Sequence, residues 1–224
     1  LLTREHGRVS ALARAARKSK KRFAGALEGF ALIAVDLTFG RGQLARLDAA
    51  RVTRVFPRLL GDLARLEPAG GLMRLARELL PERVPEPAVF ELLSDSLALL
   101  DEAAHPARAV SLAGAAQLLA LTGFAPQVAG CVGCGKEPGP GQSAMFDAAR
   151  GGIVCRACGG GPDRMTGKAR ARLSFVLGAP LRDAVAQAAD VAPAELREAE
   201  RLLSLFSSHV LAQTPAEAGG GRAR

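Results

Sequence analysis

The stretch Cys131-Val132-Gly133-Cys134, followed after twenty residues by Cys155-Arg156-Ala157-Cys158, decides how this sequence is organised. The chain has four cysteines, and they form two Cys-x-x-Cys pairs of identical spacing. Two such pairs separated by about 15–20 residues are typical of a tetrahedral zinc site. A two-residue gap lets both thiolates of a pair turn onto one ion, and a short hairpin brings the second pair opposite. We therefore predict one structural Zn²⁺ bound by Cys131, Cys134, Cys155 and Cys158.

Two other interpretations of the cysteines stay open at this stage. A thiol–disulfide redox centre uses a single Cys-x-x-Cys pair, so two matched pairs suit it less well. Two structural disulfides need an oxidising compartment, and residues 1–22 are too basic and polar to contain the apolar segment of a secretion signal. Four thiolates leave zinc no open position, so the site is expected to hold chain together.

Glycines surround both pairs. We expect Gly130, Gly133, Gly135 and Gly159-Gly160-Gly161 to supply the turns with positive φ that such knuckles use, because glycine adopts this conformation without steric cost. Pro138-Gly139-Pro140-Gly141 then forms the loop between the knuckles. The short strands Met145–Asp147 and Gly152–Val154 are expected to form the hairpin of a zinc ribbon.

The composition indicates which kinds of partner the chain can bind. Its 224 residues carry a formal net charge of +8, and 49% of them are hydrophobic. A positive surface concentrates polyanions, of which nucleic acid is the commonest and an anionic membrane the next, although a general bias toward Arg and Ala runs along the chain. No run of 18 apolar residues occurs, so no membrane-spanning helix is predicted.

The densest positive charge lies in Arg14-Ala15-Ala16-Arg17-Lys18-Ser19-Lys20-Lys21-Arg22, where six of nine residues are basic and none is acidic. Such a run is either a solvated loop or a phosphate-binding patch. Because it connects two predicted β-hairpins in a basic chain, we favour phosphate binding.

The elements outside the ribbon divide into a β-rich start and helices. Residues 1–56 predict a small barrel or curled sheet, with Gly7 at the first turn and a preceding strand missing before Leu1. The expected strands are Leu1–Thr3, Arg8–Arg14, Phe30–Phe39 and Leu44–Val55. The expected helices are a segment from Pro57 that is broken at Gly70-Gly71 and stopped by Pro81 and Pro85, one from Pro87, one over Ala107–Thr122, one over Thr166–Leu177 and a last one from Pro193.

The groups that an enzyme needs are not brought together by this sequence. His6, His105 and His209 are scattered, and the cysteines are assigned to metal. There is no phosphate-binding loop of the Walker type and no Asp/Glu cluster of a two-metal nuclease. We therefore predict neither an active site nor a small-molecule substrate.

The order of the motifs resembles the RecO family of bacterial recombinational DNA repair proteins. The resemblance extends from Leu1 to about Gln213. It rests on Leu1-Leu2-Thr3-Arg4-Glu5-His6-Gly7-Arg8-Val9, the basic Ala16-Arg17-Lys18-Ser19-Lys20-Lys21-Arg22, Leu121-Thr122-Gly123-Phe124-Ala125-Pro126-Gln127-Val128 leading into the first cysteine pair, and Gly151-Gly152-Ile153-Val154-Cys155-Arg156-Ala157-Cys158.

This resemblance implies an α+β multidomain protein. Its N-terminal OB-fold β-barrel would lack the first strand, and an α-helical C-terminal domain would carry the inserted four-cysteine zinc ribbon. The expected divisions are residues 1–57 for the barrel, 58–127 and 163–213 for the two parts of the helical domain, 128–162 for the ribbon, and 214–224 for a disordered tail. Some relatives lack the cysteines, which argues that zinc is structural in this family.

The same resemblance implies a recombination mediator rather than an enzyme. Such proteins bind single- and double-stranded DNA, anneal complementary strands coated with single-strand-binding protein, and act with RecR to help load RecA. We expect a cytoplasmic, nucleoid-associated protein without a membrane partner. The predicted DNA contacts are Arg4, Arg8, Arg14, Arg17, Lys18, Lys20, Lys21 and Arg22.

Two rival hypotheses remain at the level of the sequence. A zinc-containing regulator that binds a specific DNA sequence needs a short helix-turn-helix with polar base-reading residues, and none is convincing here. A metal-dependent nuclease needs the carboxylate cluster that the sequence does not show.

Overall fold

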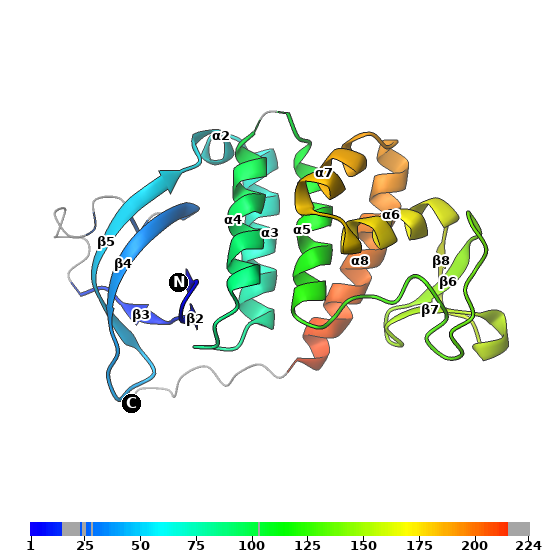
Figure 1. Cartoon of the computed structure of the whole chain (residues 1–224), viewed down its shortest axis with the longest axis horizontal. Helices are drawn as coiled ribbons and strands as arrows, with labels where there is room; N and C mark the ends of the chain where they lie inside the picture. Colours follow the sequence, from blue (N-terminus) through cyan, green and yellow to red (C-terminus); the bar gives the residue numbers. More distant parts are fainter. Residues whose placement is uncertain (15–22, 24–25, 28, 103, 215–224) are drawn as a thin grey trace.

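The computed structural model describes residues 1–14, 23, 26–27, 29–102 and 104–214. Figure 1 shows an elongated molecule in which an N-terminal sheet, a helical body and a ribbon follow one another along the longest axis. The α+β architecture with N-terminal strands and a helical C-terminal part is therefore confirmed. No helix among the described residues has the length and apolar character needed to cross a membrane.

The N-terminal strands form two small sheets. Strands β1 (Leu2–Thr3) and β2 (Gly7–Arg8) make an antiparallel hairpin, and Gly7 has a φ of 63°. The second sheet has the order β3-β5-β4. Its strands are β3 (Ala11–Leu12), β4 (Ala31–Thr38) and β5 (Ala45–Val55). The single return strand expected over Arg8–Arg14 is thus wrong, because β2 pairs with β1 whereas β3 runs parallel to β5.

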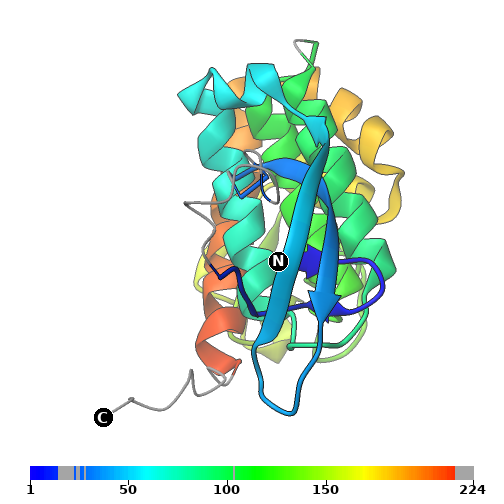
Figure 2. The same ribbon diagram turned by 90° about the vertical axis from the view of Figure 1, so that its left-hand side faces the viewer.

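The long strands β4 and β5 curl (Figure 1), and Figure 2 shows them side by side in front of the helices. Their antiparallel ladder changes register between Leu32 and Ile33 and again between Asp36 and Leu37. Such bulges bend a strand and increase its twist. One side of this sheet covers a small core, to which Phe23, Ala26, Leu47 and Ala50 contribute their buried side chains.

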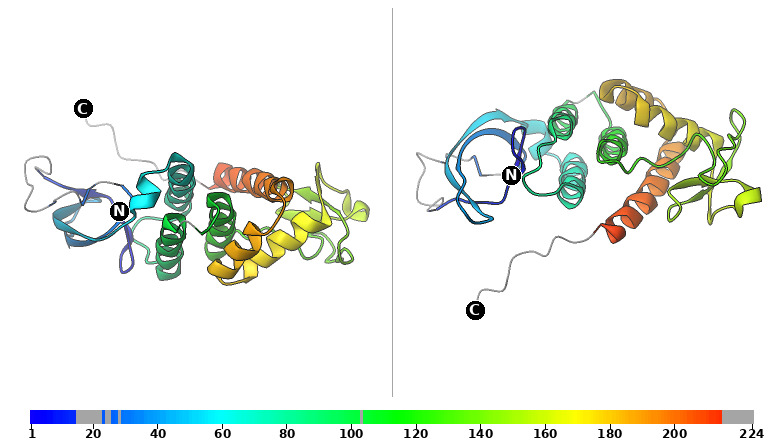
Figure 3. Two further views of the ribbon diagram at one scale, coloured as in Figure 1. Left: turned by 90° about the horizontal axis from the view of Figure 1, so that it is seen from above. Right: turned by 60° about the horizontal axis from the view of Figure 1, so that its bottom comes forward.

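The helical body is arranged around α5 (Ala107–Leu121), and half of the buried residues of this helix are Ala or Gly. Figure 3 shows α5 with α3 and α4 on one side and the C-terminal helices on the other. A Cβ on Gly114 would lie 3.1 Å from side-chain atoms of Leu72 and Ser96, so glycine permits this close packing. In the part of the chain that the structure describes, the other α-helices are α2 (Pro57–Leu60), α3 (Leu63–Leu79), α4 (Pro87–Asp101), α6 (Gly167–Gly178), α7 (Leu181–Ala189) and α8 (Pro193–Gln213).

The break predicted at Gly70-Gly71 is wrong, because α3 continues through both glycines and also contains Pro68. Each glycine inside a helix costs about 1 kcal/mol relative to alanine. Burial of Ala69 and Leu72 on the inner side of the helix offsets this cost, since most helical stability in proteins comes from tertiary packing. The predicted helix end before Pro81 and the start at Pro87 are confirmed.

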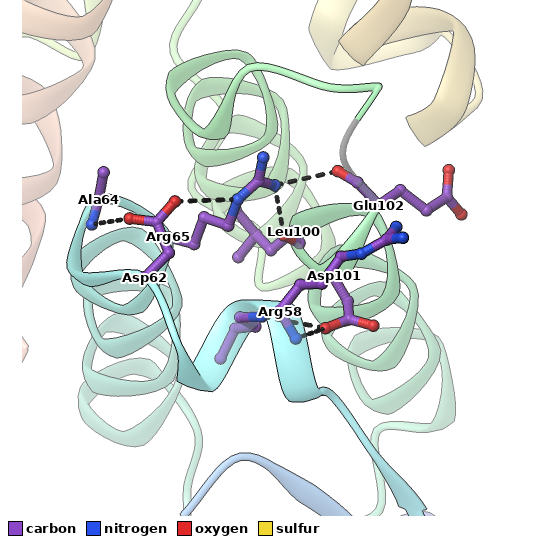
Figure 4. A network of polar contacts seen from close by, with 8 residues as sticks. Arg58, Asp62, Ala64, Arg65, Leu100, Asp101 and Glu102 are labelled. Carbon is purple, nitrogen blue, oxygen red and sulfur yellow. Dashed lines mark hydrogen bonds and ion pairs between the residues drawn. The ribbon is translucent and has the colours of Figure 1, made fainter.

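The passage from the sheet to the helical body is fixed by caps that cross between helices (Figure 4). One carboxylate oxygen of Asp101, at the end of α4, accepts hydrogen bonds from the backbone N–H groups of Arg58 and Leu59 at 2.8 and 3.0 Å. In return, Arg65 of α3 donates to the backbone oxygens of Leu100 and Glu102 at 2.7 and 3.0 Å. The free N–H groups in the first turn of α2 are therefore satisfied by a side chain at the end of α4, and a free carbonyl in the last turn of α4 is satisfied by a side chain of α3.

The ribbon contains three strands in the order β7-β6-β8. Strands β6 (Ala144–Asp147) and β7 (Gly152–Val154) form the predicted hairpin, whereas β8 (Asp163–Met165) was not predicted. Phe146, Ile153 and Met165 are buried in the same hydrophobic core as the helices. The ring of Phe146 meets that of Phe206 of α8 edge to face, with centroids 6.5 Å apart. The ribbon thus shares its core with the helical body.

Candidate metal centre and nucleic-acid interface

The structure brings the four predicted cysteines together. Their Sγ atoms all lie within 4.8 Å of one another, and those of Cys134 and Cys155 are 3.7 Å apart. A tetrahedron of thiolates with Zn–S bonds of about 2.3 Å has S–S edges of roughly 3.8 Å. One cluster of four sulfurs fits a single shared ion better than two separate disulfides, which would bring the sulfurs together in pairs at about 2.05 Å.

Two tight turns present the thiols. In the first knuckle the N–H of Gly135 donates to the oxygen of Cys131 at 2.8 Å. In the second, the N–H groups of Cys158 and Gly160 both donate to the oxygen of Cys155 at 3.0 Å. The second knuckle ends in a short 3₁₀ turn, η2 (Arg156–Cys158). Each turn folds the two cysteines of its pair toward the same point.

The glycines around the knuckles divide into two kinds. Positive φ is confirmed at Gly135 (76°), Gly159 (99°) and Gly160 (67°). It is wrong for Gly130, Gly133 and Gly161, which serve close approach instead. A Cβ at these three positions would lie 2.7 Å from the oxygen of Gly135, 3.1 Å from the Sγ of Cys158 and 2.5 Å from the oxygen of Phe146, respectively.

The electrostatics of the cluster favour thiolates that share a cation. Backbone N–H groups of Cys155 and Gly133 donate to the Sγ of Cys131 at 3.3 and 3.4 Å, and they lower the pKa of this thiol to about 6. The thiols of Cys155, Cys134 and Cys131 raise the pKa of Cys158 to about 12. Four sulfurs this close cannot all ionise without a counter-charge, and a divalent metal ion provides one.

Polar contacts hold the ribbon on α8. Arg201 forms an ion pair with Asp163 at 2.7 Å. The backbone N–H and the hydroxyl of Thr166 donate to the two carboxylate oxygens of Glu198 at 2.8 and 2.7 Å. These contacts fix β8 and the start of α6 against α8. The ribbon thus packs its inner side on the helical core. The cysteine cluster lies in the knuckles outside that core.

The predicted DNA contacts within the described residues lie at two places. Arg4 pairs with Glu91 of α4. Arg8 donates from its Nε to the oxygen of Leu80 at 2.9 Å and lies 3.7 Å from Glu82. Both therefore lie where the β1–β2 hairpin meets the helical body. Arg14 is exposed beyond β3, and Arg17, Lys18, Lys20, Lys21 and Arg22 lie outside the described residues. Of the tail predicted over residues 214–224, residues 215–224 also lie outside them, whereas Thr214 is described and donates to the oxygen of Val210.

Sequence reasoning missed the loop between α3 and α4 as a contact surface. A Cβ on Gly7 would lie 1.8 Å from the oxygen of Val84, so the hairpin and this loop touch at their backbones. The neighbouring Arg83 has a φ of 60° and donates its backbone N–H to the oxygen of Arg8 at 2.8 Å. The local sequence signal for this loop is the pair Pro81 and Pro85, which flank Arg83 and Val84 and restrict the backbone.

Comparison with known proteins assigns both parts of the chain. Residues 1–56 match the protein family described as "Recombination protein O N terminal", and residues 60–216 match "Recombination protein O C terminal". The chain belongs to the RecO family. The division between the two matches falls at α2, where Phe56 and Leu59 are already buried in the helical core.

Individual RecO proteins are similar over nearly the whole chain. The DNA repair protein RecO of Anaeromyxobacter sp. (strain K) is 40% identical over 215 residues, which cover 94% of this chain and 83% of that protein. The corresponding protein of Myxococcus xanthus (strain DK1622) is 37% identical over 212 residues, covering 94% and 84%. That of Syntrophus aciditrophicus (strain SB) is 33% identical over 215 residues, covering 93% and 82%. RecO membership gives this chain a role in DNA repair and recombination.

Proposed function

We propose that this chain is a recombination mediator that acts without covalent chemistry. It binds single- and double-stranded DNA irrespective of sequence, anneals complementary strands, and acts with RecR to help load RecA on strands coated with single-strand-binding protein. The observation that carries this proposal is RecO similarity over both parts of the chain, joined to a net charge of +8. Its place of action would be the cytoplasmic nucleoid.

Annealing needs charge neutralisation above all. Two strands repel through their phosphates, and a protein that neutralises phosphates releases their condensed counterions. Arg4 and Arg8 each lie beside a carboxylate of the helical body, so we assign them a smaller share of DNA binding. The larger share goes to the basic run, namely Arg14, Arg17, Lys18, Lys20, Lys21 and Arg22.

The cofactor that fits the cysteine cluster is one Zn²⁺. A set of four thiolates with tetrahedral spacing selects zinc or an iron–sulfur centre, and zinc is the structural choice. When bound, the ion would neutralise the thiolates and join the two knuckles. Metal analysis of the purified protein should find one zinc and no iron per chain.

We propose the predicted divisions of the chain as functional units. Residues 1–57 would bind DNA, and the separate small core under the sheet supports this division. Residues 58–127 and 163–213 would form one body, with the ribbon 128–162 inserted between them and 214–224 as the tail. The shared core of the helices and the ribbon supports grouping these segments.

A groove of about 540 Å³ between α3, α5 and α8 is our candidate for docking the acidic, apolar tail of single-strand-binding protein. Leucines cover its floor, and Arg74 supplies a cation for the tail. Glu78 and Glu200 also line the groove, and the carboxylate of Glu200 is paired with Arg108. The leucines in the lining are Leu72, Leu75, Leu112, Leu203 and Leu211.

The experiment that tests the proposed function reverses the charge of the basic run. Changing Lys18, Lys20, Lys21 and Arg22 together to Glu should abolish annealing and DNA binding while zinc stays at one per chain. Two double variants with the same change in net charge separate the effect of position from that of charge. Lys20→Glu combined with Lys21→Glu should weaken DNA binding far more than Arg77→Glu combined with Arg197→Glu on the helical body. Annealing that persists unchanged in the fourfold variant would disprove this assignment.

The same samples discriminate the rival hypotheses. Binding by the proposed mediator should fall by several orders of magnitude between 50 and 200 mM salt, on the order of 10³ for six phosphates neutralised. A preference for one duplex sequence that survives this change would favour a regulator. Cleavage products after incubation with DNA and Mg²⁺ would favour a nuclease.

A further inference from the structure

The turn between β4 and β5 exposes an aromatic ring at the edge of the N-terminal sheet. Phe39 directly follows β4, and by alternation it lies on the same side as Val35 and Leu37. Its side chain remains 40% exposed, and Leu44 on the other arm of the turn is 59% exposed. Arg41 lies between them on a turn without a carboxylate. Apolar and positive groups thus alternate along an exposed turn.

The ring and the turn are held by other parts of the chain. The imidazole of His6 meets the ring of Phe39 edge to face, with centroids 4.9 Å apart. The guanidinium carbon of Arg83 lies over the ring, 5.6 Å from its centroid. The same guanidinium donates to the oxygens of Gly42 and Gln43 at 2.9 and 2.6 Å. Arg83 does this from a left-handed conformation, which arginine rarely adopts.

This arrangement suits an unpaired base. Aromatic side chains beside cations are the stacking platforms of proteins that bind single strands. Stacking is indifferent to sequence, because every base has a π-face. A base inside a duplex is already stacked on its neighbours and cannot use such a ring.

We propose that Phe39 stacks on a base of single-stranded DNA while Arg41 contacts the adjacent phosphate. The contact rests on the proposed DNA binding and deepens it, because it provides a preference for single strands that the basic run Arg14–Arg22 does not. Arg83 is a positioning residue: it holds the ring and the turn in place for the base.

A fluorescent reporter tests the proposal directly. The chain has no Trp and no Tyr, so Phe39→Trp introduces its sole indole. Titration with oligo(dT) should quench this fluorescence, and the quenching should saturate at the affinity measured by anisotropy of labelled DNA. Phe175→Trp is the matched control, because Phe175 is 38% exposed on α6, a helix that lies on the ribbon side of α5, away from the sheet (Figure 1). Its fluorescence should not change.

Affinity and its salt dependence separate stacking from charge. Phe39→Ala should weaken binding of oligo(dT) by about 5- to 150-fold, as expected for the loss of one stacked base, and should leave the slope of log K against log[salt] unchanged. Arg41→Gln should reduce that slope by about 0.7, the value for one phosphate of a single strand. Phe39→Ala should leave duplex affinity unchanged, and Phe175→Ala should alter neither.

The outcomes are distinct. If the wild-type chain binds oligo(dT) but the indole at position 39 is not quenched, or if Phe39→Ala binds as tightly as Phe175→Ala, the stacking proposal is overturned and DNA binding stands. If the wild-type chain binds no DNA, the proposed function itself fails. Should Phe39→Ala unfold, the quenching of Phe39→Trp still decides, because that variant keeps an aromatic ring.

Discussion

At the scale of single residues, the site was predictable where its partners are close in sequence. Each Cys-x-x-Cys pair forms its own turn, so the spacing alone placed Cys131 beside Cys134. The role of Arg8 was not predictable, because its partners Leu80 and Glu82 lie more than 70 positions away. The glycines show the same limit: a positive φ is a local property, whereas close approach depends on atoms elsewhere in the fold.

Gly133→Ala should weaken the metal centre. The new Cβ would lie 3.1 Å from the Sγ of Cys158 and 3.3 Å from the guanidinium of Arg150, so a sulfur must shift. Overpacking of this kind typically costs about 1–3 kcal/mol, which corresponds to roughly 5- to 150-fold weaker zinc binding. Competition with a chromogenic chelator measures the change.

Gly139→Ala is the control within the ribbon, because its Cβ would meet the flexible side chain of Gln142. Zinc affinity of Gly139→Ala should equal that of the wild-type chain. If Gly133→Ala retains wild-type affinity as well, the close contact with Cys158 does not constrain the metal centre.

At the scale of elements, long patterns were predicted well and short ones were not. Strand β4 and helices α4 and α5 carry repeated apolar positions, and the structure confirms them. Strand β8 has three residues, too few to show alternation, and it exists because β6 offers a free edge. The continuous α3 shows the opposite effect, since packing of its inner side overrides local helix-breaking signals at Gly70-Gly71.

Asp101→Ala should loosen the joint between the sheet and the helical body. It removes the acceptor for two N–H groups of α2, and loss of a helix cap costs about 0.5–2 kcal/mol. Urea denaturation should show this decrease in the free energy of unfolding. Asp95→Ala, at an exposed position of the same helix, is the control and should stay within about 0.5 kcal/mol.

Asp101→Asn distinguishes capping from charge, because its amide oxygen remains an acceptor. It should recover most of the stability lost in Asp101→Ala. Equal stability of Asp101→Ala and Asp95→Ala would show that the crossed caps do not stabilise the joint.

At the scale of the whole molecule, the metal centre belongs to the helical body rather than to the predicted DNA-binding surface. Phe146, Ile153 and Met165 are part of the helical core, whereas most buried side chains of the sheet form a small second core, and Leu2, Phe30 and Leu32 pack against the helical core from its edge. Figure 1 shows the ribbon and the sheet at opposite ends of the molecule. Zinc is therefore expected to affect stability first and DNA binding second.

Cys155→Ser should lose zinc and melt at a lower temperature, by roughly 10 °C, because the free energy of metal binding contributes to folding. Chelation of zinc from the wild-type chain should give a similar shift in a thermal scan. Below the melting temperature of the variant, its affinity for oligo(dT) should equal that of the wild-type chain. A loss of affinity in a fully folded variant would instead indicate that the ribbon contacts DNA.

The insertion of the ribbon between α5 and α6 has a consequence for biosynthesis. Helix α5 is the central helix of the body, yet its partners α6, α7 and α8 leave the ribosome only after the ribbon. Because translation adds about 5–20 residues per second, roughly 5 to 20 s pass between the synthesis of α5 and that of the last of these partners, and during this time the apolar sides of α5 lack them. A nascent ribbon that captures zinc during this interval directs the later helices back to α5. Zinc-starved cells should therefore accumulate newly made chains on chaperones before any mature protein is lost.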